Sequence, residues 1–192
     1  MTRPKMINRS ILATLSVGVL GTAIALAGSA SSEAASTSAE SVARSSSVPE
    51  AIAVPAGNVA IADFAAQGVQ VYQCTAGAWV FVEPAANLLG RTLTRPITVQ
   101  TAVHFRGPSW QSSTDGSLVT ATAVANSPVP GSIAQLLLKA ATNRGDGIFG
   151  KVSYIQRLNT AGGTAPAGAC TDGTTTGIRY TATYRFFTPA TS

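Results

Sequence analysis

Alternating hydrophobic and polar residues predict a mainly β domain over residues 54–188. This alternation is typical of strands that bury one face, and Gly, Asn, Asp and Pro between the stretches favour turns. The expected strands are 69–74, 78–82, 97–105, 118–124, 151–158 and 178–187. About seven short strands in one domain fit a β-sandwich or a small β-barrel.

Two of these stretches carry further structural information. The stretches 69–74 and 78–82 are separated only by residues 75–77 and are expected to form a hairpin. In 178–187 the spacing predicts that four residues share one face. They are Tyr180, Ala182, Tyr184 and Phe186.

One short helix is predicted over about residues 132–143. Ser132 and Gln135 have the spacing of a capping box, in which each side chain bonds a first-turn amide. Gly145 would end the helix. The apolar face would comprise Ile133, Leu136, Leu137 and Ala140.

The first 30 residues have the pattern of a secretory signal peptide. Arg3, Lys5 and Arg9 precede an uncharged apolar run over 11–27, and small residues with the spacing of a cleavage site lie at its end, over 25–27 and 28–30. We expect cleavage and a secreted, extracellular protein without a membrane attachment. A retained N-terminal membrane anchor is the alternative, because the run is nearly long enough to span a bilayer.

A Ser/Ala-rich segment follows, and we expect residues 31–53 to be a disordered spacer. Residues 31–47 include eight Ser and four Ala and no aromatic residue. Such a composition buries too little apolar surface to offset the entropy of ordering. The ordered domain is therefore expected over 54–188.

The net charge of +5 suggests nucleic-acid binding at first sight. Three of the 13 basic residues lie in the leader and all eight acidic residues lie beyond it, so the exported chain carries +2. Its basic residues are dispersed and offer little phosphate neutralisation. We expect no nucleic-acid partner.

Cys74 and Cys170 are the two cysteines of the chain. Export places them where disulfides persist, so we expect them to pair, with a free nucleophilic thiol as the alternative. With one His besides, the chain lacks the ligands of a typical zinc site, and we expect no metal.

Residues 145–150 match the dinucleotide-binding pattern G-x-G-x-x-G. That site needs a strand before the glycines and a helix after them. Here the predicted helix precedes them and a predicted strand follows. We interpret them as a turn, and expect neither a cofactor nor NAD-dependent dehydrogenase activity.

Candidate chemistry is concentrated in residues 104–117. His104, Asp115 and Ser109 are of the types that form a base, its orienting acid and a nucleophile. Arg106 and Trp110 are candidate binding residues in the same stretch, most of which we place in loops. The structural alternative is that His104 ends a strand and bonds locally while Trp110 packs over the core.

Two further binding candidates lie elsewhere. Trp79 could join Trp110 in a platform on which a ligand stacks, although core packing is the commoner role of Trp. Arg157, within a predicted strand, could clamp a carboxylate or pair with an Asp.

Several segments together resemble an exported bacterial and fungal family, the domain of unknown function DUF3455. They are 68–74, 104–110, 115–117, 136–138, 154–163, Pro166, Cys170 and 180–186. The resemblance spans about residues 52–188 and implies export and the cysteine pair, but no reaction or catalytic residues. Family members often carry Trp where this chain has Gln135.

The function we expect is non-catalytic binding of a small molecule, a glycan or a cell-wall component. Catalytic residue types are scarce, whereas His104, Arg106 and Trp110 lie within one segment. The alternatives are a secreted hydrolase that uses His104 with Asp115 and a nearby Ser, and a structural surface protein. The sequence leaves the oligomeric state open.

Overall fold

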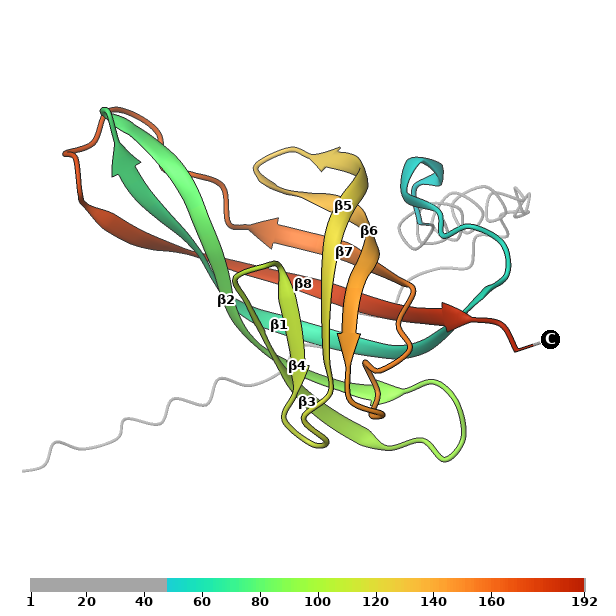
Figure 1. The fold of residues 1–192 in the computed structure, drawn as a ribbon. Coiled ribbons are helices and arrows are strands. Elements are labelled where there is room, and N and C mark those ends of the chain that lie inside the picture. Colours follow the sequence, from blue (N-terminus) through green and yellow to red (C-terminus); the bar gives the residue numbers. More distant parts are fainter. Residues whose placement is uncertain (1–47, 192) are drawn as a thin grey trace, which may run out of the picture. The chain divides into compact units, whose positions relative to one another are not determined.

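Eight antiparallel strands form a closed barrel in the computed structural model, which describes residues 48–191 (Figure 1). Each strand pairs with the next along the chain, and β8 pairs with β1. The strands are β1 (Asn58–Thr75), β2 (Ala78–Thr92), β3 (Val99–Phe105), β4 (Ser109–Ser112), β5 (Leu118–Val129), β6 (Ser132–Arg144), β7 (Tyr154–Gly162) and β8 (Thr175–Pro189). The mainly β prediction is confirmed, and the closed sheet selects the barrel.

The up-and-down order of the strands gives the barrel two distinct ends. The connections 76–77, 106–108, 130–131 and 163–174 lie at one end, called the upper end from its place in Figure 1. The other connections and the C-terminal end of β8 lie at the lower end. Successive antiparallel strands place alternate connections at the same end.

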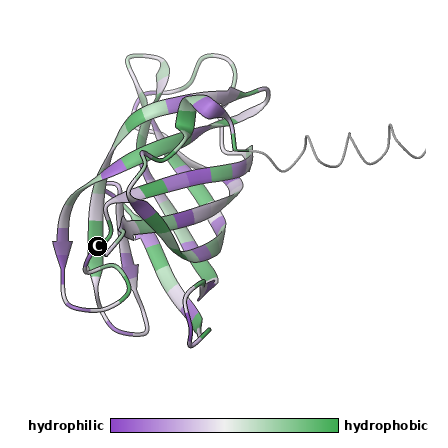
Figure 2. Ribbon diagram, turned by 90° about the vertical axis from the view of Figure 1, so that its right-hand side faces the viewer, coloured by the Kyte–Doolittle hydropathy of each residue, from purple (hydrophilic) through white to green (hydrophobic). Residues whose placement is uncertain are grey.

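Strand β8 shows the predicted alternation. Tyr180, Ala182, Tyr184 and Phe186 are all buried on the inward face of the barrel. Hydrophobic and hydrophilic residues alternate in bands along the strands in Figure 2. The period of two in the sequence therefore identified the interior face of this strand correctly.

The helix predicted over 132–143 is wrong, because Ser132–Arg144 is strand β6. It pairs with β5 along most of its length and with β7 through 136–139. The Ser132 hydroxyl donates to the backbone carbonyl of Gly162 at 3.2 Å, and the side-chain carbonyl of Gln135 accepts from the backbone amide of Asn159 at 3.1 Å. Both side chains of the supposed capping box thus bond to β7 or its end.

Burial on both faces explains the continuous apolar run of β6. Leu136 and Leu138 face the interior, whereas Leu137 packs outside the barrel against Ile52 and Leu158. A strand covered on both sides loses the polar–apolar alternation and cannot be distinguished from a buried helix by periodicity.

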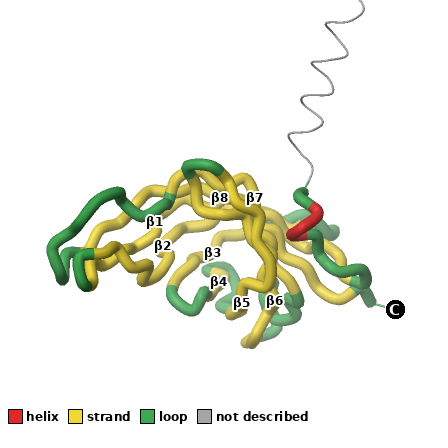
Figure 3. Tube along the Cα trace, turned by 90° about the horizontal axis from the view of Figure 1, so that it is seen from above, coloured by secondary structure: helices red, strands yellow, loops and turns green. Residues whose placement is uncertain are grey.

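The outer cover is the short helix η1 (Glu50–Ile52), the one helix in the described residues (Figure 3). Ile52 is fully buried, and its carbonyl accepts a 2.7 Å hydrogen bond from the Gln156 amide. Residues 50–52, which were predicted to lie in the spacer, therefore contact the barrel.

Residues 1–47, which hold the predicted signal peptide and most of the spacer, lie outside the described residues. Within 48–191, no helix is long and apolar enough to cross a membrane.

Aromatic side chains fill the lower part of the interior. Phe64, Phe149 and Phe186 are fully buried, with ring centroids 4.6 to 5.8 Å apart. Phe149 comes from the loop with the G-x-G-x-x-G pattern, which joins β6 to β7 and begins no helix. These glycines form a turn, as expected, and the loop helps to close the barrel.

A disulfide joins Cys74, near the end of β1, to Cys170 in the loop before β8. The Cα atoms of the pair are 5.8 Å apart. Nearby, the Asp172 carboxylate accepts a 2.8 Å hydrogen bond from the Gly77 amide. The long loop is thus tied to the β1–β2 hairpin by the disulfide and by several hydrogen bonds, including those between the Cys74 backbone and Gly173 and Thr174.

Candidate functional site

A cavity of about 670 Å³ occupies the upper part of the barrel interior. Its mouth is formed by residues of the upper end, including Phe81, Gly107 and Pro108. Most of the lining is apolar or aromatic. The polar residues on the barrel walls around it are Gln70, Tyr72, His104, Thr122, Arg157 and Tyr184.

Strand parity brings polar residues of β1 into this interior. The strand expected over 69–74 is present as part of β1, and its even-numbered residues face inward. Gln70 and Tyr72 are 3% and 7% exposed, whereas Val69 and Val71 are only half-buried. The Tyr72 hydroxyl donates a 2.6 Å hydrogen bond to the Gly163 carbonyl. The interior face thus carries amide and phenol groups where an apolar face would be usual.

Three aromatic rings from different strands form one wall of the cavity. His104 on β3 stacks on Trp110 on β4, with centroids 4.3 Å apart and planes inclined by 9°. Tyr184 on β8 meets both rings edge-on, at 5.0 and 5.4 Å. The loops expected around 107–108 and 115–116 are present, but residues 109–112 between them form strand β4, which pairs with β3 and places Trp110 opposite His104.

His104 is held as a neutral imidazole. It is 3% exposed, and its Nδ1 donates to the Ser109 carbonyl at 2.8 Å. Because a carbonyl only accepts, this bond places the proton on Nδ1 and leaves Nε2 unprotonated. Burial lowers the pKa of His104 to about 4, despite the opposing effect of the Ser109 bond. The imidazole is therefore uncharged at neutral pH.

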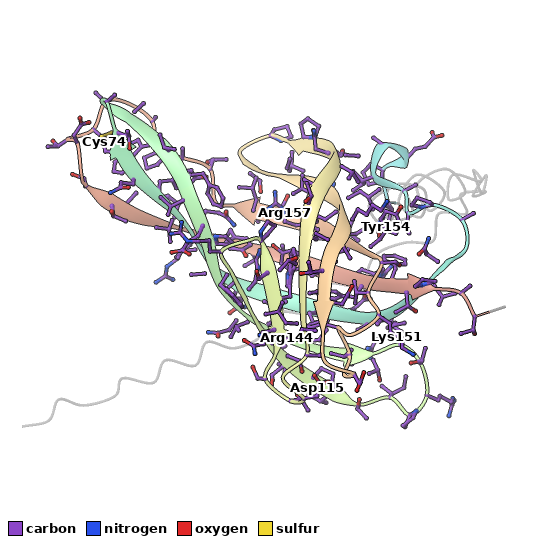
Figure 4. The ribbon with its side chains drawn as sticks, in the orientation of Figure 1. Cys74, Asp115, Arg144, Lys151, Tyr154 and Arg157 are labelled. Carbon is purple, nitrogen blue, oxygen red and sulfur yellow. A yellow bond between two sulfur atoms is a disulfide. The ribbon has the colours of Figure 1, made fainter. Side chains whose placement is uncertain are left out.

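The structure does not join the residues of the hydrolase hypothesis. His104 bonds to a backbone carbonyl and to no carboxylate of the described residues, and the Ser109 hydroxyl donates to the Arg106 carbonyl at 2.8 Å. Asp115 lies at the lower end, away from Arg157, as Figure 4 shows. The alternative in which His104 bonds locally and Trp110 packs in the interior describes the observed arrangement.

Asp115 organises the lower loops. Its carboxylate accepts from the Ser117 amide and hydroxyl at 2.9 and 2.6 Å, and from the Ile148 amide at 2.9 Å. Partial burial acts to raise the pKa of Asp115, but these hydrogen bonds outweigh it and hold the pKa below its ordinary value. A Cβ on Gly147 would overlap this carboxylate, which explains a glycine at that position.

Arg157 is the basic group of the cavity wall. On β7 the inward positions are Ile155 and Arg157, and Arg157 lies opposite Leu136 of β6 and Tyr184 of β8. Its Nε donates to the Ala134 carbonyl at 3.0 Å. Within residues 48–191, no carboxylate lies within 4.0 Å of it. Figure 4 shows Arg157 in the upper part of the barrel.

The charge of Arg157 acts on the phenols around it. Burial raises the pKa of Tyr72 and of Tyr184, and the positive charge of Arg157 partly opposes that rise in both. The Tyr180 and Tyr184 hydroxyls lie near the guanidinium without a well-formed hydrogen bond. The guanidinium therefore lies among neutral groups.

The other predicted binding residues are at the mouth or elsewhere. Arg106 is at the mouth, where its Nε is 3.1 Å from the Glu83 carboxylate. Trp79 lies opposite Cys74 in the β1–β2 hairpin and is half-buried, whereas Trp110 is 1% exposed inside the barrel. The two Trp residues thus form no common platform.

Sequence reasoning missed Gln70, Tyr72 and Tyr184 as cavity residues. The predicted inward face of 178–187 included Tyr184, so its position was implied although its role was not. The sequence does carry a signal for Gln70. Residues 68, 70 and 72 lie on one face of the strand, and the aromatic Tyr72 suggests that this face is the buried one, so Gln70 could have been identified as an inward residue.

A second hollow, of about 1110 Å³, lies outside the sheet. It is lined mainly by outward residues of β1, β2, β3 and β8, among them Leu89 and Val103, which are 61% and 36% exposed. It lacks a buried polar cluster like that around Arg157. Across the described part of the chain, no three His, Cys, Asp or Glu side chains are grouped so as to hold a metal ion.

The model of one protein family matches this chain. It is described as a protein of unknown function (DUF3455), and the match covers residues 55–188. No curated protein and no solved structure matches the chain.

Proposed function

Since the chain belongs to the DUF3455 family, whose description states no activity, we propose from its cavity that the protein binds a small organic molecule inside the barrel. The observation that carries this proposal is the 670 Å³ cavity with the His104–Trp110–Tyr184 wall. An interior of eight strands is wide enough to hold one small ligand.

The lining has the composition of a ligand pocket. Such pockets are mostly apolar and aromatic, with a few polar groups that orient the ligand. Ile133, Leu136 and Leu138 supply apolar surface from β6, while Arg157 and Gln70 supply polar groups. The polar groups come from different strands that the closed barrel holds in place, so the pocket is largely preformed.

Binding is favoured over hydrolysis by the hydrogen bonds around His104. A general base needs an orienting partner and a nearby nucleophile. Here Nδ1 of His104 bonds to the Ser109 carbonyl, and the Ser109 hydroxyl donates to the Arg106 carbonyl. A small molecule is favoured over a glycan because Trp110 is buried and offers no open stacking surface. The disulfide is compatible with the extracellular location that we also propose.

The experiment uses the neutral fluorophore N-phenyl-1-naphthylamine, whose emission rises in apolar surroundings. We expect saturable binding to the wild-type protein with one site per chain. Ile133→Trp, which places an indole in the cavity, should weaken this binding at least about tenfold, because the added side chain occupies the ligand's volume.

Val103→Trp is the matched control, since it adds the same indole to the outer hollow. Binding lost in Ile133→Trp and kept in Val103→Trp supports the interior site. Binding lost only in Val103→Trp, or no saturable binding to a folded wild-type protein, contradicts it.

A further inference from the structure

The carboxylates of the described chain leave Arg157 without an acidic partner. Two other arginines have one: Arg185 binds Asp63 through two 2.7 Å hydrogen bonds, and Arg106 binds Glu83. The described carboxylates are Glu50, Asp63, Glu83, Asp115, Asp146 and Asp172, and none of them lines the cavity. Because His104 is neutral, the cavity wall around Arg157 carries an uncompensated positive charge.

The hydrogen bonds of the cavity show the same imbalance. Nε of Arg157 donates to the Ala134 carbonyl, and within 48–191 its two terminal nitrogens make no well-formed hydrogen bond, although the Tyr184 hydroxyl lies near them. Among the described residues, three buried groups of the lining also lack a well-formed hydrogen bond: the Gln70 amide nitrogen, the Trp110 indole nitrogen and the Tyr184 hydroxyl. All three can donate a hydrogen bond, and the indole can only donate. The buried groups of the lining that lack a partner among the described residues are thus all potential donors.

Leaving buried donors unpaired costs free energy, and so does a charge such as that of the half-buried Arg157 without an opposite charge nearby. A ligand that brings a negative charge and several acceptors would remove both costs at once. A planar carboxylate fits a guanidinium through two parallel hydrogen bonds. The aromatic wall beside Arg157 would take an apolar or aromatic body attached to that group.

Building on the proposed function, we infer that the ligand is a small organic carboxylate, with its carboxylate on Arg157 and its apolar or aromatic body against His104 and Trp110. The preference for a carboxylate depends on the charge of Arg157 and on the unpaired donors, whereas the binding of neutral molecules needs only the apolar cavity. The two proposals can therefore fail separately.

The test compares 2-naphthoate with 2-naphthamide, a neutral molecule of nearly the same shape, by isothermal titration calorimetry at pH 7. We expect the wild-type protein to bind naphthoate at least about tenfold more tightly, as a charge-assisted hydrogen bond predicts. Arg157→Gln should abolish the preference. Arg157→Lys should retain part of it, since it keeps the charge but loses the two-pronged contact.

Arg144→Gln is the matched control, because it removes the same charge from an exposed position at the end of β6. It should keep the preference. Thermal unfolding of each variant confirms folding, and if Arg157→Gln does not fold, the Arg157→Lys comparison decides the question.

Equal binding of the two naphthalenes to the wild-type protein overturns the carboxylate inference, and so does a preference that survives Arg157→Gln. In either case binding of N-phenyl-1-naphthylamine at the interior site would leave the proposed function standing. Failure of all three probes to bind a folded wild-type protein overturns both.

Discussion

The imidazole of His104 lies flat against the indole of Trp110, with centroids 4.3 Å apart and planes within 9° of parallel. The two residues are direct partners across the β3–β4 turn, and the Ser109 carbonyl beside Trp110 holds Nδ1 of His104. Burial of the pair inside the barrel keeps the imidazole neutral, with consequences for stability that can be measured.

The stability of the protein should fall as the pH drops from about 7 to 4. The folded-state pKa of His104 is about 4 and its ordinary value is 6.5, so the unfolded chain takes up the proton first. The free energy of unfolding should therefore decrease across this window by at most about 3 kcal/mol. Urea denaturation at a series of pH values measures the slope.

His104→Phe is the comparison for this prediction, because it keeps an aromatic ring in the stack and cannot titrate. It should have a shallower slope between pH 6.5 and 4. Asp115 acts in a different window: its pKa is depressed, so its contribution is lost only as the pH falls below the ordinary value of 3.8. Identical slopes for the wild type and His104→Phe would show that the ring does not stay neutral.

Removal of the Cys74–Cys170 disulfide should strongly destabilise the barrel. The bond joins residues 96 apart in the sequence. The chain-entropy model assigns a loop of this length about 4–5 kcal/mol. Denaturation of the wild type with and without a reductant, and of Cys74→Ser/Cys170→Ser, measures the effect. The double variant should not respond to the reductant; a wild type that is equally stable when reduced would contradict the prediction.

Asp115 should be a structural residue of the lower loops. Asp115→Asn places an amide group against donors that now bond a carboxylate, and weakening the hydrogen bonds of the buried Ser117 costs about 1–3 kcal/mol. The free energy of unfolding should fall accordingly, while binding of N-phenyl-1-naphthylamine stays unchanged. Asp146→Asn, at an exposed position of the same lower loops, is the control. Loss of binding in a folded Asp115→Asn variant would instead connect this carboxylate to the site.

Ile52→Ala should destabilise the barrel by about 2–4 kcal/mol, in the range for removing a large buried aliphatic side chain. Ile52 covers Leu137 and Leu158 on the outer face of the sheet. Glu50→Ala, on the exposed side of η1, should change little. Equal effects of the two substitutions in chemical denaturation would show that η1 does not contribute as a cover.

How far the sequence predicts the fold can be seen in β8 and β6. In β8 one face is buried and the other is not, so the period of two survives and Tyr180 to Phe186 were assigned correctly. In β6, Leu137 is buried outside the barrel by Ile52, which is 85 residues earlier in the chain. Local spacing cannot register a contact over that distance, and Ser132 and Gln135 then resembled a helix start.

The site shows the same division. His104, Trp110 and Arg157 were singled out by residue type, and all three line one cavity. Asp115 and Trp79 were grouped with them by proximity in sequence or by chemistry, yet the barrel places them elsewhere. Gln70 and Tyr184 were not grouped with them, because nothing local relates β1 and β8 to β3.

The sequence by itself determined the β-rich class, the inward face of β8 and the cysteine pair, since these depend on side-chain period and on the number of cysteines. Only the tertiary structure decided that β6 is a strand, that Asp115 and His104 are apart, and that Arg157 faces a cavity without an acidic partner among residues 48–191. These outcomes depend on which strands close the barrel and which residues cover it from outside. Both are contacts between residues far apart in the chain, which no local pattern specifies.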